Sequence, residues 1–228
     1  MDATRSDPSP RIATLVAFPA ILTLAVTILR LVGELQHWGS PWVVNSRGGS
    51  ALTVLGVTWL PLLFGPYFAW KLIKSGFGPS SVGAAVAAAF GSVVVFLAGS
   101  VVAGYTETHP GILTLVGFLI ALAAAFIPGK GWRALGVTLL TYAFAARIPV
   151  AIVMLIAMSA HGGQGLGTHY DAVGEQFSAL ASTWQRKFVL FGLIPQMTLW
   201  IGSTAAVGSL IGTLLTAIFG FGKRPATA

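Results

Sequence analysis

Six long apolar stretches constrain the fold of this chain more than any other feature of its sequence. A helix that crosses the hydrocarbon core of a bilayer, ~30 Å thick, needs about 20 mostly apolar residues. Stretches of this kind occupy residues 12–33, 51–73, 81–105, 111–127, 132–159 and 188–219. They predict an all-α fold, a polytopic membrane bundle of six transmembrane helices within residues 11–222, between polar tails at residues 1–10 and 223–228.

The composition supports a membrane protein and excludes several other classes. Only 8% of the 228 residues are charged and 55% are hydrophobic, whereas soluble domains average about 25% charged residues. The net charge of +7 comes mostly from basic residues at the ends of the apolar stretches, so it does not indicate nucleic-acid binding. The absence of cysteine excludes disulfides, iron–sulfur clusters and thiolate zinc sites.

The distribution of basic residues predicts the orientation of the bundle. Six spans place both termini on one side, which receives eight lysines and arginines against four on the other side. Because cytoplasmic loops carry the excess of basic residues, both termini are predicted to be cytoplasmic. We expect the protein to lie in the plasma (inner) membrane.

Arg147 is the most informative single residue, because it lies near the middle of the fifth apolar stretch. A charge at the centre of a spanning helix costs about 2.5–3.5 kcal/mol on insertion scales, and arginine keeps its proton. No acidic residue lies within any of the six stretches, and Glu34 directly follows the first. Candidate partners are Tyr142, Gln196 and the carbonyl that Pro149 leaves without a helical N–H donor.

Arg30 and Glu34 form a second charged pair, near the end of the first stretch. Their spacing of four residues places them on the same helix face, where they can form an ion pair. Two interpretations remain open: a pair at the membrane interface with a structural role, or part of a ligand-binding site together with Arg147.

The fifth loop, residues 162–186, carries most of the remaining polar chemistry. It is predicted to contain a short surface helix over residues 171–184, with Asp171 as its N-cap. A weak candidate site for a divalent metal consists of His161, His169, Asp171 and Glu175. Their spacing matches no tight metal-binding template, so the alternative is that they are hydrated loop residues.

Small residues recur at four-residue spacing in the third stretch, residues 81–105, and glycines thin one face of the sixth, residues 188–219. Such faces let helices approach closely, and they predict contacts within the bundle, with a second copy of the chain or with a partner membrane subunit.

Three functional hypotheses follow. The first is binding or transport of a small anionic or amphipathic ligand, such as a lipid, in a cavity around Arg147. The second is a membrane-embedded enzyme, with or without a metal, that acts at the outer face. The third is an accessory or structural subunit of a membrane complex.

Overall fold

The computed structural model describes residues 10–43, 53–105, 111–174 and 177–220, and these residues form helices without any strand. The main helices are α1 (Ile12–Leu35), α2 (Leu60–Lys74), α3 (Val82–Tyr105), α4 (Ile112–Ala123), α6 (Arg133–Gly163) and α9 (Leu199–Phe219). Short helical segments link them: η1 (Ala124–Phe126), α5 (Pro128–Gly131), α7 (Trp184–Lys187), a π-helix (Phe188–Leu193) and α8 (Ile194–Met197). The predicted all-α bundle is therefore confirmed.

Five helical segments in the described part of the chain are long and apolar enough to cross a membrane. They are residues 12–35, 82–104, 112–131, 133–163 and 184–219. These segments fit a membrane-integral protein, as the apolar stretches predicted.

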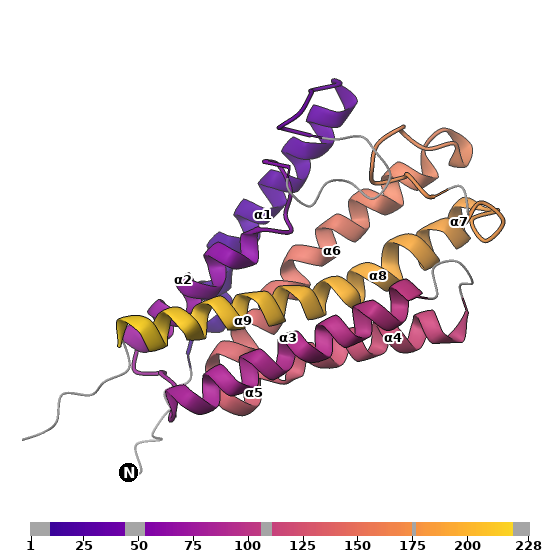
Figure 1. The fold of residues 1–228 in the computed structure, drawn as a ribbon. Coiled ribbons are helices and arrows are strands. Elements are labelled where there is room, and N and C mark those ends of the chain that lie inside the picture. Colours follow the sequence, from indigo (N-terminus) through magenta and orange to yellow (C-terminus); the bar gives the residue numbers. More distant parts are fainter. Residues whose placement is uncertain (1–9, 44–52, 106–110, 175–176, 221–228) are drawn as a thin grey trace, which may run out of the picture.

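Helix α9 lies at the centre of the bundle and contacts α2, α3, α4 and α6, while α1 packs mainly on α6 (Figure 1). The start of α1 and the end of α9 lie at the same end of the molecule. Residues 160–174 and the end of α1 lie at the opposite end, which we call the loop end (Figure 1).

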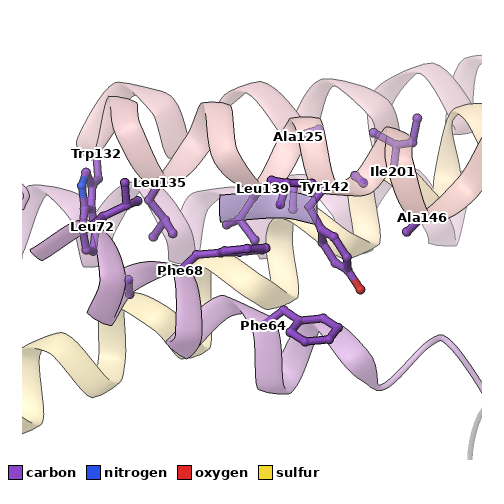
Figure 2. Close-up of a cluster of buried hydrophobic side chains, with 14 of the residues drawn as sticks. Phe64, Phe68, Leu72, Ala125, Trp132, Leu135, Leu139, Tyr142, Ala146 and Ile201 are labelled. Atoms are coloured by element: carbon purple, nitrogen blue, oxygen red, sulfur yellow. The ribbon is translucent and has the colours of Figure 1, made fainter. Parts of the chain in front are cut away.

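The core lies between α2 and α6, where residues spaced three or four apart face each other across the two helices. Phe64 and Phe68 of α2 lie beside Tyr142 and Leu139 of α6, and Leu72 lies beside Leu135 and Trp132 (Figure 2). The Tyr142 ring makes edge contacts with the Phe64 and Phe68 rings, at centroid distances of 5.2 and 5.5 Å. This packing fixes the half of α6 that precedes Arg147.

Glycines set the closest helix contacts of the bundle. Gly202 of α9 packs against the Ala121 carbonyl of α4, and Gly65 of α2 packs against the Gly208 backbone, so a Cβ at either position has no space. The small-residue face predicted for residues 188–219 is thus used inside the chain. On α3 the small residues predicted to pack closely have two outcomes: Gly83 and Ala87 are exposed, whereas Ala84 and Ala88 lie in close contact with Gly131. Gly99 makes a further close contact with α4.

The second apolar stretch differs from its prediction, which placed a span over residues 51–73. Helix α2 has 15 residues and begins at Leu60, so Pro61 lies in its first turn, where the missing N–H of a proline breaks no helical hydrogen bond. Residues 51–52 lie outside the described residues, and residues 53–59 form turns. At ~1.5 Å per residue, α2 is shorter than the ~30 Å hydrocarbon core.

The last span is irregular where the sequence predicts one continuous helix over residues 188–219. A π-helical segment precedes Pro195, which has no N–H to donate, and Thr198 departs from helical geometry with φ −124° and ψ −79°. The Thr198 hydroxyl donates to the Ile194 carbonyl at 2.6 Å. The π-helix, Pro195 and Thr198 interrupt the span just before the residues that meet Arg147.

The described residues 171–174 and 177–183 do not form the predicted surface helix. Turns around Phe177 and Leu180 take its place, and α7 begins only at Trp184, with Thr183 as its N-cap. The prediction of Asp171 as an N-cap was wrong, because its carboxylate accepts hydrogen bonds from residues that precede it.

Candidate functional site

Arg147 is buried in the bundle, with 3% of its surface exposed. Its Nη2 donates to Thr204 Oγ1 of α9 over a long 3.4 Å, and its guanidinium lies over the Trp200 ring, 5.0 Å from the ring centroid. Its Nε is buried without a hydrogen-bond partner, and no carboxylate pairs with it within the described residues. The charge is therefore held by one weak hydrogen bond and a cation–π contact.

The side chains predicted as partners of Arg147 form other bonds. The Tyr142 hydroxyl lies 2.9 Å from Thr23 Oγ1 of α1. Gln196 Nε2 donates weakly to Met154 Sδ at 3.6 Å, which leaves the buried Gln196 Oε1 without a partner in the described structure. Neither side chain forms a hydrogen bond with the guanidinium. Thr204 and Trp200, which do contact it, carried no signal in the sequence because they lie on a distant span.

Arg30 and Glu34 form the predicted ion pair, with Arg30 Nε 2.8 Å from Glu34 Oε1. The pair is buried rather than exposed at an interface: the Glu34 side chain is 0% exposed and the Arg30 side chain 7%. The far side of the carboxylate is met by the fifth loop, whose His169 backbone amide donates to Glu34 Oε2 at 2.9 Å. We call Arg30, Glu34 and His169 the Glu34 cluster.

The His169 ring also contacts this carboxylate. Its Nδ1 lies 2.5 Å from Glu34 Oε1, although the ring is not aligned for a regular hydrogen bond. The neighbouring Tyr170 hydroxyl donates to the Thr27 carbonyl of α1 at 3.3 Å. Two consecutive loop residues are thus fastened to the last turns of α1.

Asp171 shapes the loop that presents His169. Its carboxylate accepts from the amides of Gly167 and Thr168 and from the Thr168 hydroxyl, at 3.1, 2.8 and 2.6 Å. Gly165 has φ +91°, and a Cβ there would collide with this carboxylate. The missing side chain of Gly165 therefore lets the loop backbone approach the Asp171 carboxylate closely.

The four candidate metal ligands do not converge in the described structure. His161 is exposed, with Nδ1 3.0 Å from the Gly165 carbonyl oxygen, while His169 and Asp171 are engaged as above. Glu175 lies outside the described residues. No group of three His, Asp or Glu side chains that could hold a metal ion is found among residues the structure describes.

A sequence signal for the Glu34 cluster was available but missed. Thr23, Thr27, Arg30 and Glu34 recur on one face of the first apolar stretch, and all four are buried. Polar residues that share one stripe of a membrane helix face protein or water rather than lipid. The stripe therefore identifies the face of α1 that packs on α6, although it does not reveal which distant residue completes the cluster.

Burial changes the proton affinity of His169 and of the neighbouring Tyr170. It lowers the pKa of His169, and the contact with the Glu34 carboxylate offsets this effect only in part. Burial also raises the pKa of Tyr170. At neutral pH the imidazole is therefore uncharged and the Tyr170 hydroxyl keeps its proton.

Comparison with known proteins finds no matching family model, no matching curated protein and no matching solved structure. The function must therefore be argued from the Arg147 contacts and the Glu34 cluster alone.

Proposed function

We propose that this membrane protein binds or transports a small anionic or amphipathic molecule whose negative group meets Arg147. The observation that carries the proposal is the buried guanidinium, which has a free Nε and a single 3.4 Å hydrogen bond within the described part of the chain. A buried charge of this kind is costly until a counter-charge or several strong hydrogen bonds satisfy it. An anionic oxygen of a ligand supplies both.

The surrounding helices support this role. Arg147 faces the first turns of α9, directly after the irregular segment that ends at Thr198. Interrupted helices at membrane depth frequently line ligand sites, because their backbone and neighbouring side chains can rearrange around a bound group. Gln196, on the other side of the interruption, adds a buried carbonyl oxygen without a partner in the described structure.

A test of the proposal compares one charged amphiphile with its uncharged analogue. The full-length protein in phosphatidylcholine nanodiscs would be titrated with dodecanoate and with dodecanol, and the thermal shift measured. Dodecanoate is expected to stabilise the wild type while dodecanol does not. Arg147→Gln should lower the dodecanoate affinity by roughly 10–100-fold, the value of one or two charge-assisted hydrogen bonds.

Arg133→Gln provides a matched control, since Arg133 is an exposed arginine at the start of the same helix. It should leave dodecanoate binding unchanged. Native mass spectrometry of the purified wild type would show whether a natural anion is retained. Equal responses to both amphiphiles, together with a wild type that carries no anion, would leave Arg147 with a structural role between α6 and α9.

A further inference from the structure

The Glu34 cluster is a second polar site, and its chemistry differs from that of Arg147. Its carboxylate is fully buried, and each of its oxygens has a partner: Arg30 Nε and His169 Nδ1 for Oε1, the His169 amide for Oε2. Arg30 Nη2 remains without a partner within the described residues. A salt bridge between Arg30 and Glu34 that only stabilised the fold would not require an imidazole nitrogen 2.5 Å from the carboxylate oxygen.

The two nitrogens of His169 lie in different surroundings. Nδ1 is buried against the carboxylate. Nε2 makes no hydrogen bond to any residue that the structure describes and is not a buried atom, so it is the accessible nitrogen of a side chain that is 19% exposed. A carboxylate only accepts hydrogen bonds, so its attraction places the ring proton on Nδ1. Nε2 then carries the lone pair that is available to a molecule outside the cluster.

We propose that His169 is a general base for a small molecule that carries an O–H group, such as water or an alcohol, and that reaches Nε2 at the loop end of the bundle. Glu34 is the positioning residue, which fixes the tautomer and the orientation of the ring. Arg30 holds Glu34 in place. This site is independent of anion binding at Arg147.

The proton transfer balances without any other reactant. The Nε2 lone pair forms a new N–H bond while the O–H bond of the substrate breaks, and the bonding electrons stay on the substrate oxygen. The imidazolium that results is stabilised by the Glu34 carboxylate, 2.5 Å from Nδ1, which it shares with Arg30. Returning the proton to the product restores the starting state.

The charged and titratable groups that face the ring are compatible with this role. They are Arg30 and Glu34 on α1, and Asp171 and Tyr170 beside it on the loop. Burial keeps the pKa of His169 below its usual value, so the neutral base is present at pH 7. The Tyr170 ring packs against the imidazole with a centroid distance of 3.9 Å and limits its rotation.

The tautomer of His169 tests the proposal without a known substrate. The full-length protein, with isotope-labelled histidine in lipid nanodiscs, would be examined by solid-state NMR, with His169 assigned by comparison with His169→Gln. The neutral ring is expected to carry its proton on Nδ1, whereas free histidine favours Nε2. A His169 ring protonated on Nε2 at neutral pH would overturn the proposal, and this result requires no variant at Glu34.

The reactivity of Nε2 provides the second measurement. Diethyl pyrocarbonate acylates an unprotonated imidazole nitrogen, and mass spectrometry gives the rate at each histidine. Glu34→Gln is expected to slow acylation of His169 by roughly tenfold, as when the partner that orients an imidazole is removed. Asp171→Asn loosens the same loop without touching the ring, so it should leave the tautomer on Nδ1. An acylation rate that does not change in Glu34→Gln, or a tautomer that changes equally in Asp171→Asn, would contradict the assignment of Glu34.

Discussion

Glu34 Oε2 accepts a hydrogen bond from the backbone amide of His169, a residue 135 positions further along the chain. This bond joins the end of α1 to the fifth loop and places an imidazole on a buried carboxylate. Through this bond, the Arg30–Glu34 ion pair within α1 becomes part of a site that also includes the fifth loop. The stability and the chemistry of the loop end should therefore both depend on this carboxylate.

The first prediction concerns removal of the Glu34 charge. Glu34→Gln leaves Arg30 buried without its counter-ion, and we expect a loss of stability of about 3–5 kcal/mol. Thermal unfolding in nanodiscs measures the loss, and hydrogen exchange at residues 165–171 should rise with it. The double variant Arg30→Met, Glu34→Met should recover part of the stability, because it leaves no unpaired charge. A double variant as unstable as the sum of the single ones would contradict this explanation.

How far the sequence predicts this site depends on the distance between the residues along the chain. The Arg30–Glu34 pair follows from a spacing of four residues on a helix, so the sequence is sufficient to predict it. The contact of His169 with Glu34 depends on the path of a loop across the bundle, which no local pattern encodes. The same holds for Arg147 and Thr204, which lie 57 positions apart on different spans.

The fold, like the site, can be predicted from the sequence only in part. Long apolar stretches predict the helices, since membrane thickness fixes their length. The late start of α2 at Leu60 and the interruption at Thr198 depend on how individual prolines are accommodated, and Pro66 shows that a proline need not end a helix. The predicted helix is not seen in the described residues 171–174 and 177–183, where Asp171 accepts hydrogen bonds from the loop before it instead of capping a helix that follows.

The second prediction tests the glycine that lets this loop close on Asp171. Gly165→Ala combines a positive φ with a collision against the Asp171 carboxylate, so we expect a loss of about 1–3 kcal/mol. Gly167→Ala has the positive φ of +75° but open space, and should cost less. Gly91→Ala, in open space within α3, should be neutral or stabilising by up to about 1 kcal/mol. Equal effects of the three substitutions on thermal unfolding would refute this ordering.

The third prediction concerns pH. Burial lowers the pKa of His169 below its value in the unfolded chain, so the unfolded state binds the proton more readily. The contribution of His169 to stability is therefore complete above the unfolded pKa of about 6.5 and is lost as the pH falls towards the lower folded pKa. Melting temperatures between pH 7.5 and pH 5 should fall in the wild type. His169→Gln should remove that part of the decrease, and an identical profile in both proteins would exclude His169 as its source.

The fourth prediction tests close packing in the centre of the bundle. Gly202→Ala places a Cβ against the Ala121 carbonyl and forces α9 away from α4, so we expect a loss of about 1–3 kcal/mol. Gly104→Ala on α3 has open space and serves as the control. Because α9 also carries Thr204 and Trp200, the displaced helix should weaken dodecanoate binding together with stability. Unfolding measured by intrinsic tryptophan fluorescence over a titration with dodecanoate would show both the lower stability and the weaker binding.

The last prediction separates a structural Arg147 from a ligand-binding one. Thr204→Val removes the acceptor of the Arg147 Nη2 bond, and it also removes the hydroxyl that donates to the Trp200 carbonyl at 2.8 Å. Thr216→Val removes an equivalent buried bond within α9, to the Gly212 carbonyl at 2.8 Å, without a charge beside it. We expect Thr204→Val to cost about 1–3 kcal/mol and Thr216→Val less, because only the former leaves a buried cation with no hydrogen-bond acceptor. If an anion is the natural partner of Arg147, saturating dodecanoate should reduce the stability difference between Thr204→Val and the wild type, both measured with the ligand, and leave that of Thr216→Val unchanged. If dodecanoate does not relieve the loss in Thr204→Val, the natural partner of the guanidinium is the threonine hydroxyl and not a ligand.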